Sequence, residues 1–119
     1  MRSQVRRIAG ILGLAVVLGA CSPPAPEVPA GPDGEPDPVL LAGREVWETS
    51  CVQCHGGDGG GGRGPQLNDG VVIERYPDPV DQLAVIARGR GGMPSFDGSL
   101  SDDELEAVLR YTREVIAAD

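Results

Sequence analysis

Cys51-Val52-Gln53-Cys54-His55 is the stretch that decides the fold of this 119-residue chain. On one helical turn, two cysteines three positions apart lie on the same side of the backbone, and the next residue carries an imidazole. Two thiols placed in this way can form thioethers with the two vinyl groups along one edge of a haem, while His55 directs a nitrogen at the iron. The C-x-x-C-H spacing is therefore typical of covalent haem attachment.

Three other kinds of site use similar residues. A thioredoxin-like redox pair shares the cysteine spacing but needs a βαβ setting, and no segment of this chain alternates like a strand. A zinc site needs about four ligands, and the chain has no second Cys or His cluster beyond Cys51, Cys54 and His55. A disulfide across this spacing is geometrically awkward and leaves the histidine without a role. We therefore predict one covalently bound haem c.

The second ligand of the iron can be predicted by counting. His55 is the only histidine, the chain has no lysine, and Met93 is the only methionine after Met1. Met93 lies in Gly91-Gly92-Met93-Pro94, a loop without apolar neighbours, which argues against the alternative that it only fills a gap in the core. We predict His55 and Met93 as the axial ligands, with the soft thioether favouring the reduced iron.

The first twenty residues are typical of an export signal. A basic start, an apolar run over 8–18 and the small residues before Cys21 follow one another in the expected order. Leu18-Gly19-Ala20-Cys21 also resembles the lipobox of bacterial lipoproteins, which implies cleavage after residue 20 and lipidation of Cys21. We expect an extracytoplasmic protein held to a membrane by lipid. A buried N-terminal helix, a retained anchor and an ordinary signal peptide are the alternatives.

The mature chain is expected to have two parts. Residues 21–37 are rich in proline and lack apolar periodicity, which predicts an extended, semi-rigid linker that is a spacer rather than a core element. Residues 38–119 form the predicted folded domain. Seven glycines among residues 56–64 indicate a loop, and residues 89–99 indicate another.

Three helices can be predicted from their caps. Asp37 precedes Pro38 at the start of a helix that reaches Thr49. Asp78 and Pro79 begin a second helix in the same way, and it stops at Gly89. Ser101 and Glu104 form a capping box at the start of the last helix. The apolar face of this last helix consists of Leu105, Val108, Leu109, Thr112 and Ile116.

Charge and composition restrict the partners. The formal charge is −8 at pH 7, and removal of residues 1–20 takes away three arginines and no acid, which leaves −11. Such a chain is not expected to bind nucleic acid. It favours redox partners with a basic docking surface, although solubility alone would explain the charge. Aromatic residues make up only 3%, so the core is thin, and a buried haem would add apolar mass.

From about residue 38 to 118 the chain resembles class I monohaem cytochromes c, especially the short bacterial ones. The motifs that carry this resemblance are Gly43 with Trp47, Cys51-x-x-Cys54-His55-Gly56, Gly64-Pro65-x-Leu67, Gly92-Met93-Pro94 and Tyr111. Three features depart from the family, and the first is a Gly60 to Gly62 run that is longer than the function needs. Trp47 stands where Phe or Tyr is more usual, and the lysine ring that some members use for docking is missing.

The resemblance implies an all-α cytochrome c fold, with three to four helices around one covalently attached haem. It implies that the first and last helices cross near Gly43 and Tyr111. It also implies that the Pro65 carbonyl accepts a hydrogen bond from the second nitrogen of His55, and that Leu67 packs on the haem face. A further expectation is that one of three arginines pairs with a haem propionate: Arg63, Arg88 or Arg90.

These features together predict a single-electron carrier in an extracytoplasmic respiratory or related chain. With both axial positions filled, no small-molecule substrate reaches the iron, and we expect no enzymatic activity. A haem peroxidase or gas-binding protein would need a distal acid–base group, and no second histidine is present. The remaining alternative is an assembly lipoprotein whose cysteines never meet haem.

Overall fold

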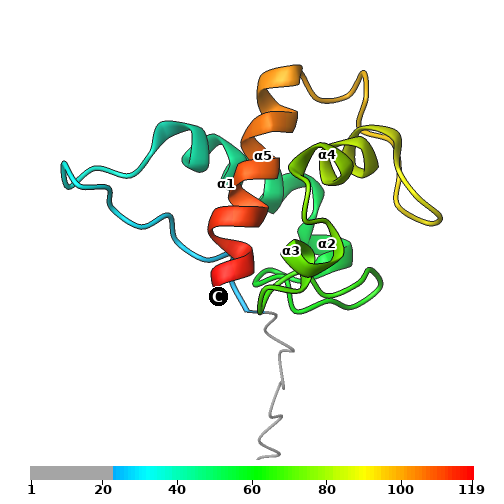
Figure 1. Cartoon of the computed structure of the whole chain (residues 1–119), viewed down its shortest axis with the longest axis horizontal. Helices are drawn as coiled ribbons and strands as arrows, with labels where there is room; N and C mark the ends of the chain where they lie inside the picture. The colour runs from blue at the N-terminus through cyan, green and yellow to red at the C-terminus, as the bar shows by residue number, and fades with distance from the viewer. Residues whose placement is uncertain (1–22) are drawn as a thin grey trace, which may run out of the picture.

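The structure is a computed structural model that describes residues 23–119, so the expected signal peptide and Cys21 lie outside the described residues. Five α-helices and one 3-10 helix follow one another in this part of the chain, and it contains no strand, only isolated bridges (Figure 1). The elements are α1 (Pro38–Ser50), α2 (Val52–His55), α3 (Val71–Arg75), α4 (Pro79–Arg88), α5 (Asp102–Glu114) and η1 (Ile116–Ala118). The predicted all-α class is confirmed.

The helix starts predicted from the caps are confirmed. The Asp37 side chain accepts a hydrogen bond from the Val39 N–H at 2.8 Å and begins α1. Asp78 begins α4 by the same kind of contact. The capping box of α5 is complete, because Ser101 and Glu104 each accept from the backbone N–H of the other. Each contact satisfies an N–H group that has no partner within its own helix.

Helices α1 and α5 cross at a point where only glycine fits. A Cβ atom at Gly43 would overlap the carbonyl oxygen of Ala107 and lie 2.7 Å from the Cβ atom of Tyr111. Next to this crossing the Trp47 and Tyr111 rings pack with their centroids 6.3 Å apart, and both side chains are fully buried. The crossing expected near Gly43 and Tyr111 is therefore present, and it forms the centre of the core.

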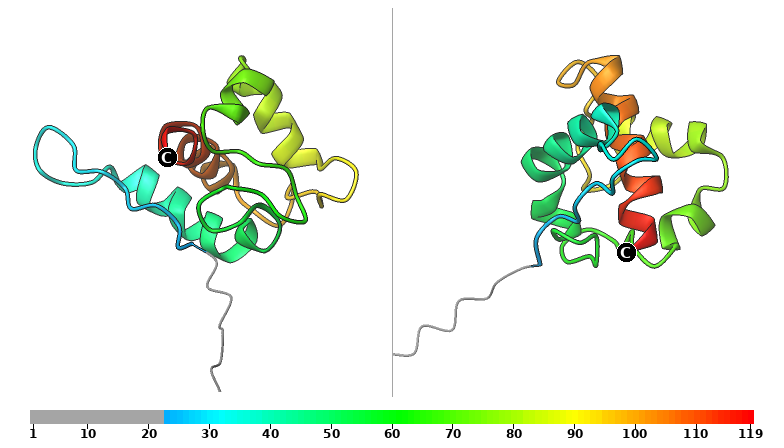
Figure 2. Two further views of the ribbon diagram at one scale, coloured as in Figure 1. Left: turned by 90° about the horizontal axis from the view of Figure 1, so that it is seen from below. Right: turned by 90° about the vertical axis from the view of Figure 1, so that its left-hand side faces the viewer.

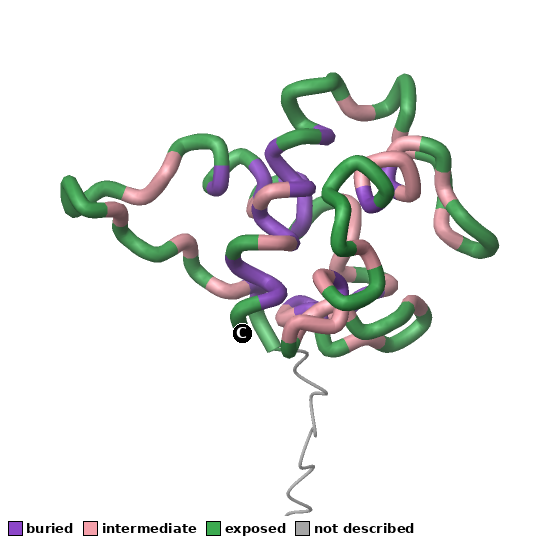
Figure 3. The backbone as a smooth tube through the Cα atoms, in the orientation of Figure 1, coloured by how far each residue is buried: buried purple, intermediate pink, exposed green. Residues whose placement is uncertain are grey.

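The proline-rich segment before α1 packs on the domain. Ala25 is only 6% exposed and belongs to the hydrophobic core. The Tyr111 hydroxyl donates to the Pro26 carbonyl oxygen at 2.6 Å, and Arg44 forms an ion pair with Glu27 at 2.8 Å. The prediction of a spacer that is not part of the core is wrong for residues 25–28, whereas most of residues 29–35 are exposed. Figures 2 and 3 show that only the first part of the segment runs beside the helices, and that its later part forms an exposed loop that projects away from them.

Helix α3 was not predicted, and it is only five residues long. It begins after Gly70, whose φ of 75° is left-handed, and it has no side-chain cap. The Gly70 N–H donates to the Ala117 carbonyl oxygen at 2.8 Å, which ties the start of α3 to η1.

None of the helices within residues 23–119 has both the length and the apolar character needed to span a bilayer.

We expect Gly43→Ala to lower the free energy of unfolding by about 1–3 kcal/mol, because the added methyl group overpacks the α1–α5 crossing. Chemical denaturation of the holoprotein measures this. Gly62→Ala is the matched control, because a Cβ atom at the exposed Gly62 would meet only the Cys54 carbonyl oxygen, at an ordinary contact distance of 3.4 Å. Equal stability of the two variants would show that the helices do not need this close approach.

The capping box of α5 makes stability depend on pH. Hydrogen bonds from the Ser101 backbone and hydroxyl hold the pKa of Glu104 below its usual value. A carboxyl whose pKa is lowered by folding stabilises the protein above its unfolded-state pKa, and this contribution is lost as the pH falls through the folded-state pKa. We therefore expect Glu104→Gln to be less stable than the wild type at pH 7. We also expect the variant to lose less stability than the wild type when the pH is lowered from 7 to roughly 3.

Thermal unfolding at stepped pH measures this effect. Glu106→Gln is the control, since Glu106 is exposed on the same helix and forms no ion pair among the described residues. If both variants follow the wild-type pH profile, the cap carboxylate does not contribute.

Candidate haem site

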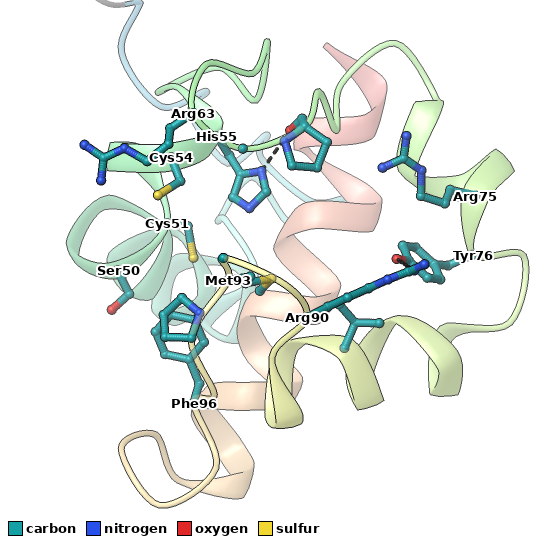
Figure 4. A pocket seen from close by; sticks show the side chains of 15 residues that line it. Ser50, Cys51, Cys54, His55, Arg63, Arg75, Tyr76, Arg90, Met93 and Phe96 are labelled. Atoms are coloured by element: carbon teal, nitrogen blue, oxygen red, sulfur yellow. Dashed lines mark hydrogen bonds between the residues drawn. The ribbon is translucent and has the colours of Figure 1, made fainter.

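A cavity of about 600 Å³ opens between α2, the loop that follows it and the loop after α4 (Figure 4). It is lined by Ser50, Cys51, Cys54, His55, Arg63, Gly64, Pro65, Arg75, Tyr76, Val85, Arg90, Gly92, Met93, Pro94 and Phe96. A smaller inner chamber of about 70 Å³ shares Cys51, His55 and Met93 with it and adds core residues such as Leu67 and Ile86. The volume lies in the usual range for cofactor sites.

The C-x-x-C-H motif forms the first wall of this cavity. Cys51 ends α1, its N–H donating to the Trp47 carbonyl oxygen, and α2 then makes a single turn. That turn ends at Gly56, where φ is 81°. Both thiols are free and half-buried, and they line the cavity together with the His55 ring. The predicted grouping of two thiols and one imidazole on one helical turn is present.

His55 is held in one orientation. It is 7% exposed, and its Nδ1 lies 2.8 Å from the Pro65 carbonyl oxygen, the contact that the resemblance implied. A carbonyl oxygen can only accept, so Nδ1 carries the proton and Nε2 keeps a free lone pair. Gly64 leaves room for the ring, because a Cβ atom there would lie 3.0 Å from the His55 Cε1. The Trp47 ring packs beside it, with centroids 6.0 Å apart.

Met93 lies on the opposite wall, across the cavity from His55 (Figure 4). Its loop is a tight turn, since Arg90 and Met93 exchange backbone hydrogen bonds of 3.0 and 3.1 Å. The Ser95 hydroxyl and the Phe96 N–H both donate to the Ala87 carbonyl oxygen, which ties the loop back to α4. The loop therefore presents the Met93 side chain from a backbone fixed at both ends.

Three arginines reach the cavity. Arg63 and Arg90 line it as the sequence suggested, whereas Arg88 does not. Arg75 lines it from α3 and was missed, because α3 itself was not predicted. Within residues 23–119, the three lining arginines form no ion pair with a carboxylate. Arg90 donates to the Tyr76 hydroxyl at 3.2 Å.

The two predicted packing residues lie in different parts of the site. Pro65 lines both chambers, and Leu67 lines only the inner one, where Val72 and Val108 are also found. Val85 of α4 and Phe96 of the loop after it also line the main cavity. They were not predicted, because nothing in the sequence around them indicates contact with a cofactor. The walls combine apolar side chains with two thiols at one edge.

The chemistry of these donors fits a haem. Burial and the neighbouring Cys54 raise the pKa of the Cys51 thiol to about 12, whereas a redox-active cysteine has a lowered pKa. Among the described residues no group of three or more His, Cys, Asp and Glu side chains is placed to hold a metal ion, so the zinc alternative gains no support. A mainly apolar cavity with thiols at one edge, an imidazole on one wall and a thioether opposite suits the porphyrin and its iron.

Known proteins are similar to this chain in sequence. A family model described as cytochrome c oxidase, cbb3-type, subunit III, matches residues 38–111. Cytochrome c6 of Leptolyngbya boryana is 35% identical over 59% of this chain and 85% of its own length. Cytochrome c-551 of Bacillus subtilis is 30% identical over 96% of this chain and 98% of its own length.

A solved structure shows the same fold. Cytochrome c6 of the diatom Phaeodactylum tricornutum superposes with a TM-score of 0.57 at 24% identity, over 65% of this chain and 93% of that one. The chain therefore belongs to the class I monohaem c-type cytochromes, electron-transfer proteins that carry one covalently bound haem c.

Proposed function

We propose that this protein is a single-electron carrier with a haem c ligated by His55 and Met93, working in an extracytoplasmic respiratory or related chain. The observation that carries the proposal is the pairing of the only histidine with the only mature methionine on facing walls of one cavity, with both thiols at its edge. When bound, the haem supplies an iron that alternates between the ferric and ferrous states.

Each side chain has a defined task in this proposal. Cys51 and Cys54 hold the cofactor covalently through thioethers. His55 provides Nε2 to the iron while its Nδ1–H bond to Pro65 fixes the ring and raises its basicity. Met93 closes the opposite side, and Pro65 and Leu67 pack against the porphyrin. Filling both axial positions keeps the ligands in place during electron transfer and leaves no site for a substrate.

We further propose that Arg75 and Arg90 bind the haem propionates. The vinyl and propionate groups of a haem lie on opposite edges, so the thioethers direct the propionates away from Cys51 and Cys54. Figure 4 shows Arg75 and Arg90 on that far side, whereas Arg63 lies next to Cys54. A carboxylate that leaves water needs such charge-assisted donors.

The location and partners follow from the N-terminal sequence and the charge. We propose export, cleavage after residue 20 and lipidation of Cys21, which would anchor the protein on the extracytoplasmic side of a membrane. A mature charge of −11 favours redox partners with a basic docking surface. The similarity to cytochromes c6 and c-551 supports a carrier rather than an enzyme.

Removal of the Met93 thioether tests the ligation. We expect Met93→Ala to lose the sulfur–iron charge-transfer band of the oxidised protein and to bind carbon monoxide rapidly when reduced. Its midpoint potential should fall by on the order of 0.1 V, because the soft ligand that favours ferrous iron is gone. Phe96→Leu, a change on the same cavity wall, is the control and should keep the band. A wild-type spectrum in Met93→Ala would refute the assignment.

Redox titration tests the arginines. We expect Arg75→Gln and Arg90→Gln each to lower the midpoint potential by roughly 40 mV, or about 1 kcal/mol for one electron, because a lost positive charge favours ferric iron. Arg88→Gln is the control, since Arg88 does not line the cavity. Equal shifts in all three variants would indicate a general effect of net charge and contradict propionate binding.

A further inference from the structure

We propose that residues 23–30, called the strap here, fix the membrane attachment point on the domain, so that one face of the protein lies against the lipid surface. This face, called the attachment face, consists of Pro23, Pro24 and the loop 56–62. The inference rests on the proposed lipidation of Cys21. In this arrangement, called the rigid mount here, the lipid anchor is joined to a fixed point on the domain and not to a flexible linker. The surface that the attachment face contacts is a lipid bilayer.

The strap begins directly on the loop that follows the haem-binding turn. A Cβ atom at Gly57 would overlap the Pro23 carbonyl oxygen and lie 3.1 Å from the Pro24 carbonyl carbon, so the strap backbone lies on Gly57 with no side chain between them. Gly57 is buried, and its own carbonyl oxygen accepts from the Trp47 Nε1 at 2.8 Å. Figures 1 and 2 show the start of the described chain beside this loop in each view.

The next three residues, Ala25, Pro26 and Glu27, are held to the domain by several contacts. Ala25 enters the core, and its carbonyl oxygen accepts from Arg44 at 3.3 Å. The Tyr111 hydroxyl donates to the Pro26 carbonyl oxygen, and Glu27 pairs with Arg44. The Tyr111 side chain is fully buried, and burial raises the pKa of its hydroxyl to about 12, so it remains a donor at physiological pH. Prolines at positions 23, 24, 26 and 29 restrict the backbone further.

Covalent reach then places the lipid near the domain. Only Ser22 separates Cys21 from Pro23, and consecutive Cα atoms are 3.8 Å apart, so the Cys21 Cα lies within about 8 Å of the Pro23 Cα. A free linker over 22–37 in the polyproline conformation would span roughly 50 Å instead. Gly57 follows His55 by two residues, so the attachment face lies next to the haem-ligand turn.

The attachment face carries little charge, so we assign its attachment to the bilayer to the acyl chains. Asp58 is the sole charged side chain in the loop 56–62, and it accepts a hydrogen bond from the Gly60 N–H at 2.9 Å. Arg63 follows this loop directly but lines the haem cavity, so the loop itself offers anionic headgroups no cation. A domain mounted in this way keeps its haem at a constant short height, and its partner is a redox protein in or on the same membrane.

Energy transfer from a fluorescent lipid headgroup to the haem tests the mount. The lipidated holoprotein is placed in vesicles, and two variants carry the same ten-residue Gly-Ser insertion. In the first, the insertion lies between Ser22 and Pro23 and frees the strap from the anchor, adding roughly 18 Å of reach. In the second, it lies between Asp33 and Gly34, in an exposed turn beyond the strap, and serves as the control.

We expect equal transfer efficiency in the wild type and the 33/34 variant, and a decrease of at least about twofold in the 22/23 variant. Equal efficiency in the wild type and the 22/23 variant would overturn the rigid mount. Absorption spectra confirm that both insertion variants hold haem in the native way. Mass spectrometry of Cys21 separates the two proposals, because an unmodified cysteine refutes the lipid anchor itself, whereas an acylated protein with unchanged transfer refutes only the mount.

Discussion

The hydrogen bond between His55 Nδ1 and the Pro65 carbonyl oxygen is the contact on which the site depends. It joins the single turn of α2 to the glycine-rich loop that follows, and it decides which ring nitrogen is free for the iron. Gly64 makes the contact possible by leaving space for the His55 ring. The Trp47 ring packs beside His55, and its Nε1–H donates to the Gly57 carbonyl oxygen. The glycine-rich loop after α2 therefore fixes the orientation of His55, and the same hydrogen bond holds the loop in place.

The core explains why so short a domain can hold a large cofactor. Its centre is the close crossing of α1 and α5 at Gly43, with Trp47, Tyr111 and Ile116 fully buried around it. Few other large side chains are available, and two additions extend this core. One is the strap, which contributes Ala25. The other is the haem, whose cavity lies against the same helices, so that cofactor and core share a continuous apolar interior.

The sequence predicts those features whose cause is local. Caps at Asp37, Asp78 and Ser101 indicate where the long helices begin, because a cap acts on N–H groups of its own first turn. The proposed ligand pair likewise comes from the sequence, because the chain has one histidine and, apart from Met1, one methionine. Covalent haem attachment can be predicted from the five residues of the C-x-x-C-H motif alone, because they are adjacent in sequence.

The features that were missed depend on distant contacts. Helix α3 has no cap of its own and is held by η1, so the position of Arg75 could not be predicted. The proline-rich strap has the composition of a free spacer, and its packing depends on Gly57, Arg44 and Tyr111. No local pattern distinguishes a proline segment that meets such partners from one that does not.

The central claim is that His55 and Met93 hold the iron from opposite sides. The most direct test is the NMR spectrum of the reduced holoprotein labelled at the methionine methyl group, since Met93 is the only methionine besides Met1, which the proposed cleavage would remove. We expect a single methyl signal shifted far upfield by the ring current of the porphyrin. A methyl signal at the ordinary position of a free methionine side chain would contradict the ligation and the carrier mechanism built on it.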